Sequence, residues 1–386
     1  MPAPVCPRIL LWWISAESSG DGAADFRDDF RDNFSGRLRL KKSRLTILII
    51  LLRYGSGYDR TMARKIDVLG IPHAYELTAP TQSSTTLVFI HGWLLSRAYW
   101  EPMIQRLSSD YRCLSYDLRG FGGSQADRAY RSANQQTEPK PGATFVKTAL
   151  VEELPPTAIA SGLSNTAIAP EFATGYTPAD YANDLGVLLD CLNIENAWLV
   201  GHSLGGNIAL WAADQMPDRV KGVVCINSGG GIYLKEEFEK FRAVGQQLVR
   251  LRSRWLCYLP LMDWMMAWMN VARPIARPWG RQRLLDLVMA DADAARGALL
   301  DSTTENEVHR LPQIVSRLQQ PVHFITGVDD SVMEPQYVLH LASFHPLFQA
   351  CGSNVTQISK CGHLAMIEHP DRVTGKIREI LSDHGA

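Results

Sequence analysis

The sequence predicts an α/β protein in which a doubly wound, mostly parallel sheet carries an inserted helical cap. Short apolar runs with the length and residue types of buried strands alternate with stretches of helical periodicity along most of the chain. Several of these runs end in turns containing Gly, His, Asp or Ser, at the edge where parallel sheets form their sites. Between residues 231 and 318 the alternation stops and only helical periodicity continues, which predicts the cap.

The composition is that of an ordinary globular protein. The 386 residues are 46% hydrophobic and 20% charged, and the formal net charge is -1. This balance gives no indication of a nucleic-acid partner. The seven cysteines are odd in number and lack CxxC spacing, which favours free thiols in a reducing compartment and predicts a cytoplasmic protein.

The first 61 residues differ from the rest of the chain. They show no fold signal, and we expect a disordered or dispensable N-terminal extension, with the functional domain starting at Met62. Two apolar runs, at 9–16 and 45–52, are far shorter than the roughly 20 residues that a transmembrane helix needs. No clear signal-peptide cleavage site follows the first run. The sequence therefore predicts no stable membrane span.

The predicted core comprises residues 62–230 and 319–386. Its first half contains four strands and one helix. The strands are expected at 65–69, 73–77, 85–90 and 113–116, and the helix at 99–107. Gly70 between the first two strands indicates an antiparallel hairpin. Residues 125–175 are rich in Ala, Thr, Pro and Ser with little periodicity, and we expect a flexible surface insertion there.

The second half of the core resumes with a strong helix start. Thr177 is placed as an N-cap, Pro178 as the first helical residue and Asp180 as an acid in the first turn. The remaining strands are expected at 197–200, 220–226, 322–326 and 355–359, and later helices at 334–344 and 371–381. Because the cap follows the strand at 220–226, we expect it to cover the carboxyl edge of the sheet.

One turn in this pattern carries a motif for nucleophilic catalysis. Residues 201–205 read Gly-His-Ser-Leu-Gly, a G-x-S-x-G that lies between an apolar strand and a helical stretch. A strand-to-helix turn of this kind strains the backbone of Ser203 and exposes its hydroxyl. The motif alone arises often by chance, and the strand and helix around it make it specific.

A serine hydroxyl needs a base to accept its proton and a carboxylate to orient that base. Asp330 follows one predicted strand and His363 follows the next, so both should emerge at the same sheet edge as Ser203. The order Ser, Asp, His is the order typical of this elbow topology. Such chemistry requires no metal and no organic cofactor.

From about residue 65 to the C-terminus, the sequence resembles α/β-hydrolases with a helical cap, in the lipase, esterase and haloperoxidase-like branch. The matching landmarks are His91-Gly92-Trp93, Asp117-Leu118-Arg119-Gly120-Phe121-Gly122-Gly123-Ser124, Gly201-His202-Ser203-Leu204-Gly205-Gly206, Gly327-Val328-Asp329-Asp330 and Gly362-His363. The resemblance implies an eight-stranded α/β-hydrolase fold with Ser203 as nucleophile, Asp330 as orienting acid and His363 as base. It also implies an oxyanion hole formed by the backbone N–H groups of Trp93 and Leu204.

Several neighbouring residues have competing interpretations. Asp329 adjoins Asp330, and the G-x-x-D spacing of the family favours Asp330 as the acid. Some relatives place their acid after the preceding strand, but Asn227 stands there in this chain. His91 and His202 flank the predicted active edge, and we expect both to hold loop backbone rather than react.

The predicted reaction is hydrolysis of a carboxylic ester through an acyl-enzyme, of the EC 3.1.1 type. The cap is rich in Trp, Met, Leu and Phe, so a small ester-like substrate with an apolar acyl or alcohol part is expected. Trp264 and Trp268 are one helical turn apart, and we expect their shared face to line the substrate pocket. The sequence gives no indication of whether the protein is a monomer or an oligomer.

Other activities use the same fold and stay open. A carbon–carbon bond hydrolase, a thioesterase or a cofactor-free perhydrolase can use the same three residues. Perhydrolase-like relatives commonly carry Met after the serine, where this chain has Leu204. Epoxide hydrolases and dehalogenases resemble the fold but use Asp at the elbow, so Ser203 argues against them. A non-catalytic binding module on this fold is the alternative from another class.

Overall fold

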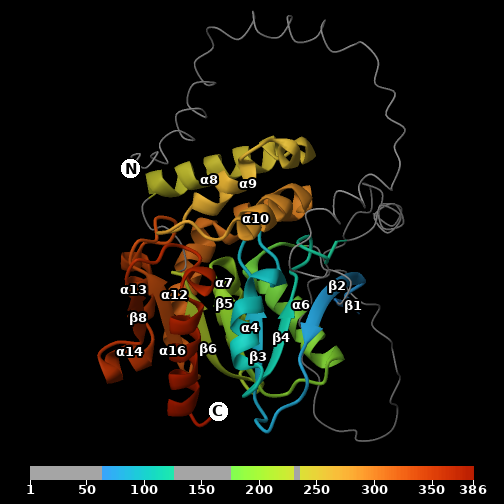
Figure 1. Ribbon diagram of the computed structural model, residues 1–386. Helices are drawn as coiled ribbons and strands as arrows, with labels where there is room; N and C mark the ends of the chain where they lie inside the picture. The colour runs from blue at the N-terminus through green and yellow to red at the C-terminus, as the bar shows by residue number, and fades with distance from the viewer. Residues whose placement is uncertain (1–62, 126–174, 230–234) are drawn as a thin grey trace, which may run out of the picture. The chain divides into compact units, whose positions relative to one another are not determined.

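The computed structural model describes residues 63–125, 175–229 and 235–386 (Figure 1). The predicted N-terminal extension, the proposed start at Met62 and nearly all of the predicted insertion at 125–175 lie outside these ranges. No helix within them is long and apolar enough to span a lipid bilayer.

An eight-stranded sheet forms the centre of the described structure. Its strands are β1 Arg64–Val68, β2 Ile71–Leu77, β3 Thr86–Ile90, β4 Arg112–Tyr116, β5 Ala197–His202, β6 Val220–Ile226, β7 Val322–Gly327 and β8 Val355–Ile358. Their order across the sheet is β1-β2-β4-β3-β5-β6-β7-β8. β2 pairs antiparallel with β1 and with β4, and every other pair is parallel. The predicted eight-stranded, mostly parallel sheet is confirmed.

The hairpin at the sheet edge follows from its turn residues. Val68 pairs with Ile71, so the connection contains only Leu69 and Gly70. Both have positive φ, 49° and 79°, which is the conformation of a type I′ turn. The Gly70 N–H also donates to the Asp67 side chain at 2.8 Å, which closes the turn.

Helices cover both faces of the sheet, which explains why its inner strands are mostly apolar. They are η2 Arg97–Trp100, α4 Glu101–Leu107, α6 Pro178–Cys191, α7 Leu204–Gln215, α13 Pro335–Ala342, α14 Pro346–Cys351, α15 Ala365–Glu368 and α16 Pro370–Asp383. Neighbouring residues of one strand point to opposite faces: Val88 packs in the cluster that contains Ile208 of α7, and Phe89 in the cluster that contains Ile377 of α16. The sheet therefore has one apolar core on each side.

Between β6 and β7, the described residues from Lys235 to Arg317 are mostly helical and contribute the layer at the top of Figure 1. The elements of this segment are α8 Lys235–Leu251, η3 Arg254–Tyr258, α9 Met262–Trp268, α10 Arg277–Met289, α11 Ala292–Ser302 and α12 Glu305–Arg317. We call α8 to α11 the cap helices. The predicted cap range also includes α12, but this helix packs on α7 beside the sheet: Glu307 bonds the Trp211 indole, and the Arg317 Nε donates to Asp214 at 2.6 Å.

Candidate active site

Ser203 occupies a strained turn between β5 and α7. Its backbone has φ 52° and ψ -119°, a conformation that non-glycine residues seldom adopt. The two flanking glycines make the turn possible, because a Cβ at Gly201 would lie 2.2 Å from the Gly205 carbonyl oxygen. A Cβ at Gly205 would lie equally close, 2.2 Å, to the carbonyl oxygen of Ile90 in β3. Any larger residue at either position would push the turn off the neighbouring backbone.

His363 and Asp330 lie in the loops that follow β8 and β7, and they form a direct hydrogen bond. The His363 Nδ1 and the Asp330 Oδ2 are 2.9 Å apart. Oδ2 also accepts from the Asn227 side-chain amide at 2.7 Å. Oδ1 accepts the backbone N–H groups of Val332 and Met333 at 2.9 and 3.0 Å. Both carboxylate oxygens are therefore used as acceptors.

The electrostatics of Asp330 follow from these contacts. Burial raises the pKa of its carboxyl group, but the charge and hydrogen bond of His363 and the two loop N–H groups outweigh that effect. The net result is a pKa below the usual value, so Asp330 is an ionised acceptor at neutral pH. Asp329 is different: its side chain is exposed, and its backbone N–H bonds the Cys361 carbonyl at 2.9 Å.

His202 connects the serine turn to the histidine loop. Its Nε2 is 2.7 Å from the backbone oxygen of His363, and the two rings are 4.9 Å apart between centroids. Burial, reinforced by the nearby His363, lowers the pKa of His202 to about 3. His202 is thus neutral and donates its Nε2–H to that oxygen. Since Ser203 is the next residue, this bond brings the serine turn and His363 into one site.

The loop after β3 runs along the serine turn. A Cβ at Gly92 would lie 3.1 Å from the Ser203 Cβ and 2.8 Å from the His202 Nδ1, so only glycine fits there. His91 fixes this loop, because its Nδ1 is 2.8 Å from the Gly92 oxygen while its Nε2 accepts the Leu118 N–H at 2.9 Å. Burial lowers the pKa of His91, which keeps the ring neutral for this pair of bonds.

The cap helices hold the same loop from the other side. The Trp93 indole N–H donates to the Ala295 carbonyl of α11 at 2.8 Å. The Ser96 hydroxyl donates to Asp286 of α10 at 3.0 Å, where Asp286 is buried. The position of the Gly92–Trp93 backbone thus depends on the cap as well as on the sheet.

Asp117 and Arg119 support neighbouring loops. Asp117 accepts from the Arg97 guanidinium at 2.6 Å and from the Gly123 N–H at 2.7 Å. Gly122 has φ 51°, and a Cβ there would lie 2.3 Å from the Asp117 Cγ. Arg119 donates to Asp184 of α6 at 2.9 Å. These buried pairs hold the loop after β4 against η2 and α6.

Two residues outside the predicted set, Asn227 and Glu368, also contact this site. Asn227, in a left-handed conformation with φ 49°, donates to Asp330 and to the Gly362 carbonyl. Glu368 accepts the N–H groups of Gly362 at 3.0 Å and of Leu364 at 3.2 Å, on either side of His363. The place of Asn227 directly after β6 was a usable signal. The position of Glu368 in the first turn after His363 was a second one.

The segment between α9 and α10 completes the histidine loop. The His363 N–H donates to the Asn270 carbonyl at 2.9 Å, and the Ala272 N–H donates to Glu368 at 2.8 Å. A Cβ at Gly362 would lie 2.7 Å from the Ala272 nitrogen, so the two backbones touch. Glu368 therefore binds the histidine loop and the cap segment with one carboxylate.

Trp264 and Trp268, which we expected from their helical spacing to line the substrate pocket, are both exposed. Their rings lie 5.4 Å apart on the exposed side of α9, whereas Met266 and Ala267 form its buried side. That buried side packs on α10, because a Cβ at Gly280 would lie 2.8 Å from the Ala267 nitrogen. The pocket role of the two tryptophans stays a prediction.

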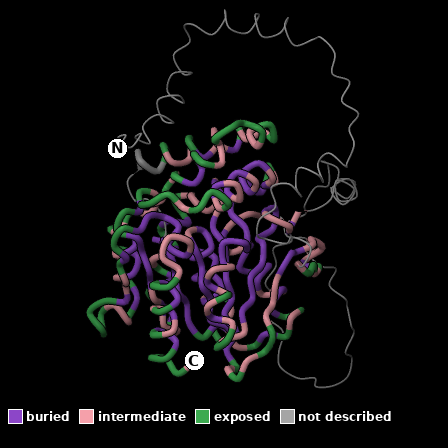
Figure 2. The backbone as a smooth tube through the Cα atoms, viewed as in Figure 1, coloured by how far each residue is buried: buried purple, intermediate pink, exposed green. Residues whose placement is uncertain are grey.

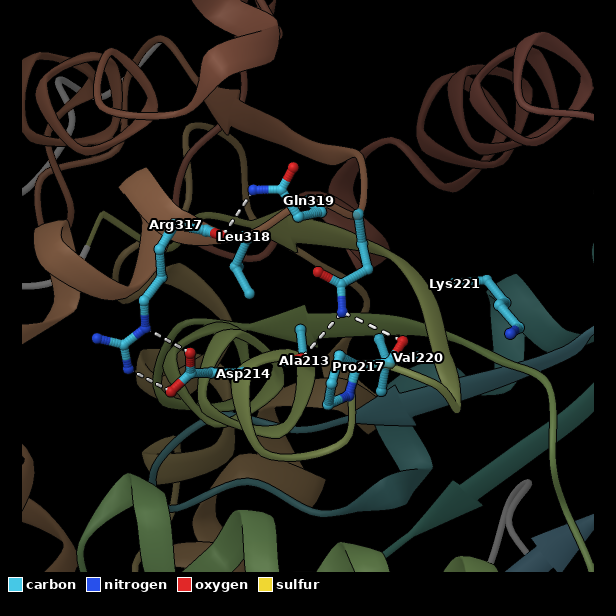
Figure 3. Close-up of a pocket in the computed structure, with 9 residues that line it drawn as sticks. Ala213, Asp214, Pro217, Val220, Lys221, Arg317, Leu318 and Gln319 are labelled. Carbon is cyan, nitrogen blue, oxygen red and sulfur yellow. Dashed lines mark hydrogen bonds and ion pairs between the residues drawn. The ribbon is translucent and has the colours of Figure 1, made fainter.

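A surface hollow of about 450 Å³ lies at the opposite edge of the sheet (Figure 3). Val220 at the start of β6 and Leu318, shortly before β7, line it. Its polar groups are mutually bonded: Arg317 pairs with Asp214, and Gln320 donates to the Ala213 carbonyl at 3.0 Å. Since Ser203 follows the carboxyl end of β5, this hollow is separate from the site.

Comparison with known proteins identifies the family to which this chain belongs. A family model described as alpha/beta hydrolase fold matches residues 85–370. RutD of Caulobacter sp. (strain K31), by name a candidate carbamate hydrolase, is 28% identical over 148 residues, 38% of this chain and 39% of that protein. The 2-(acetamidomethylene)succinate hydrolase of Mesorhizobium japonicum is 29% identical over 145 residues, 38% of this chain and 36% of that protein. The chain thus matches about two fifths of the length of these curated relatives.

A solved structure with the same fold covers more of the chain. A thermophilic esterase from Thermogutta terrifontis has a TM-score of 0.58 with this structure at 22% identity. The comparison covers 84% of this chain and 100% of the esterase chain. At this identity the likeness concerns the fold.

Proposed function

Since the chain belongs to the α/β-hydrolase fold family, we propose that this hydrolase cleaves carboxylic esters with Ser203 as its nucleophile, through an acyl-enzyme. The observation that carries the proposal is the strained backbone of Ser203 beside the bonded pair of His363 and Asp330. A strained serine turn has an energetic cost that packing must offset, and it is useful where a hydroxyl has to be presented to a substrate.

In the proposed reaction, the Ser203 Oγ attacks the ester carbonyl carbon and His363 Nε2 accepts the hydroxyl proton. Asp330 accepts the Nδ1–H of His363, which fixes the tautomer with a free Nε2 lone pair and stabilises the imidazolium. His363 then gives its proton to the departing alkoxide, which leaves as the alcohol. Water, deprotonated by His363, attacks the acyl-enzyme, and the proton returns to Ser203 as the carboxylate departs.

The oxyanion formed in each half-reaction needs two aligned donors. We assign this role to the backbone N–H groups of Leu204 and Trp93. Leu204 is the first residue of α7, and the first N–H groups of a helix have no acceptor within it. Trp93 follows Gly92, whose backbone lies against Ser203. Two such donors, fixed before the reaction, stabilise negative charge where it develops.

For the substrate we propose a small ester with an apolar acyl or alcohol part. The support is the apolar composition of the cap helices, which are dense in Trp, Met and Leu. The curated relatives bear names for carbamate and acetamidomethylene cleavage. Carbamates and amides therefore belong in the same substrate panel as esters.

The test combines turnover with covalent labelling. We expect the protein to hydrolyse p-nitrophenyl esters of graded chain length and to be labelled by a fluorophosphonate at one site. Ser203→Ala should lose both signals and retain its melting temperature. Continued labelling of that variant at one site, or turnover of amides and carbamates with no ester turnover, would overturn the proposal.

A further inference from the structure

The outer side of η3 and α9 exposes an unusual number of large apolar side chains. Six of them, between 40% and 70% exposed, are Trp255, Tyr258, Leu261, Trp264, Met265 and Trp268. We call these six residues the aromatic face. They lie within fourteen positions, and exposed residues alternate with intermediate and buried ones along the top layer of Figure 2. Several large apolar side chains exposed within one short stretch are uncommon on a protein surface and indicate an interaction site.

The backbone presents this face outward. Leu261, between η3 and α9, has φ 66°, a left-handed conformation that is strained for leucine. Its side chain is among the most exposed apolar groups of the described residues, while Met266 and Ala267 provide the packing of α9 on α10. The aromatic face is thus left over after the cap has formed its own core, and it contributes little to holding the cap together.

The charge around the aromatic face is strongly one-sided. Positions 250–283 contain seven arginines and one aspartate, in a chain whose net charge is -1. Asp263 is already paired with Arg277 at 2.8 Å. Arg250 and Arg254, at the end of α8 and in η3, are exposed, and neither forms an ion pair with any residue that the structure describes. The segment that carries the aromatic face is therefore positively charged, with Asp263 as its single acidic residue.

From this combination we propose that the aromatic face is a docking surface for an anionic lipid bilayer. Trp and Tyr rings favour the boundary between lipid headgroups and acyl chains, since their ring is apolar and their N–H or O–H is polar. Leu261 and Met265 supply aliphatic groups that enter the acyl layer. Arg250 and Arg254 meet the negative headgroups, and each such contact strengthens binding about fivefold. This inference concerns binding and does not depend on the hydrolytic reaction.

The experiment measures co-sedimentation of the full-length protein with phosphatidylcholine vesicles and with vesicles that also contain phosphatidylserine. We expect binding to the anionic vesicles that weakens as salt rises from about 0.05 to about 0.5 M, because screening reduces the arginine contribution. The double variant Leu261→Ser/Trp264→Ser should lower the partition coefficient about tenfold or more, since apolar area no longer enters the bilayer. Arg250→Gln/Arg254→Gln should lower it about twentyfold or more on anionic vesicles only.

Matched controls carry the same chemistry at other places. Phe344→Ser removes an exposed aromatic ring and Arg372→Gln an exposed arginine, both outside the cap. Both controls should bind vesicles like the unaltered protein. Ser203→Ala should also bind normally, which separates docking from catalysis and leaves this inference standing if the proposed reaction is wrong.

Three outcomes would overturn the inference. The first is equal vesicle binding by the unaltered protein and the Leu261→Ser/Trp264→Ser variant, which would move binding to another segment such as residues 1–62. The second is no binding to either vesicle type. The third is a dimer in light scattering that the variant dissociates, without vesicle binding, which would assign the aromatic face to a second copy of the chain.

Discussion

Replacing Asp330 with Asn is the sharpest test of the proposed reaction, because it changes one atom in a well-defined set of contacts. The carboxylate accepts four hydrogen bonds, two on each oxygen. An asparagine can keep only one oxygen and must place its NH₂ group in the other position. The consequence depends on which position the amide nitrogen takes.

The two orientations of the new amide differ in cost. With NH₂ toward the loop, it would face the backbone N–H groups of Val332 and Met333 and leave those two donors unsatisfied, at about 1–3 kcal/mol each. With NH₂ toward His363, it would face Asn227, whose own side chain can turn. The Asn227 Oδ1 has no hydrogen-bond partner among the described residues and can accept from the new amide. We therefore expect the second orientation.

That orientation prevents His363 from acting as the base. The NH₂ group of the introduced asparagine would donate to the His363 Nδ1, so the ring would carry its proton on Nε2 and could not accept the Ser203 proton. We expect kcat/KM for a p-nitrophenyl ester to fall by about 10⁴, equivalent to about 5 kcal/mol of transition-state stabilisation. The melting temperature should change little, because the remaining side-chain oxygen still accepts the N–H groups of Val332 and Met333.

Asp329→Asn is the matched control, since it makes the same chemical change one residue away on an exposed side chain. It should leave kcat/KM within about twofold, as surface substitutions generally have small effects. A loss of activity in Asp329→Asn with near-normal rates in Asp330→Asn would refute the reasoning and transfer the acid role to Asp329.

Substitutions at four other residues test separate contacts. Ser203→Ala should abolish fluorophosphonate labelling, measured by mass spectrometry of the intact protein, and persistent single-site labelling would reject the elbow assignment. Glu368→Ala should lower kcat/KM about tenfold or more. Glu368→Gln should lower it less, because Gln keeps one acceptor oxygen for the N–H groups beside His363. Equal rates in the two variants would contradict a positioning role for Glu368. In the folded protein the pKa of His202 is lowered to about 3, so its ring stays neutral, whereas in the unfolded chain it takes a proton below about pH 6.5. The contribution of His202 to the free energy of unfolding should therefore fall by about 2 kcal/mol between about pH 7.5 and about pH 5. His202→Gln should make that acid limb shallower in urea titrations, and an unchanged slope would contradict the burial argument. Trp268→Ala should reduce kcat/KM for long-chain soluble esters if its ring lines a pocket, whereas unchanged kinetics at every chain length would rule the pocket out.

Most of the fold could be predicted because its signals are local. The apolar runs of β3, β5, β6 and β7 reflect burial on both faces of a parallel sheet, which favours apolar residues at most positions. The turn at Ser203 could also be predicted from the sequence, because it requires glycine at positions 201 and 205. A Cβ at either position would lie 2.2 Å from a neighbouring backbone oxygen. The short helices α14 and α15 were missed because six and four residues are too few to show periodicity.

The tertiary structure decided matters that involve distant partners. The two faces of α9 are both apolar, so its sequence could not specify whether Met266 or Trp264 would turn inward. Contact with α10 made that choice and left the tryptophans exposed. Likewise, two adjacent aspartates are almost equivalent as a sequence, and the bond from His363, thirty-three residues further on, distinguishes Asp330.

The sequence by itself determined the fold class, the strained serine turn and the order of the polar loops, because neighbouring residues along the chain encode strand burial and glycine sterics. Only the tertiary structure decided how Glu368 joins the histidine loop to the cap through the Ala272 N–H, 96 positions away. It also decided that Asn227 donates to Asp330 across 103 positions. Such bonds satisfy buried polar groups that no local pattern reveals, since their partners meet only when the sheet and cap pack together.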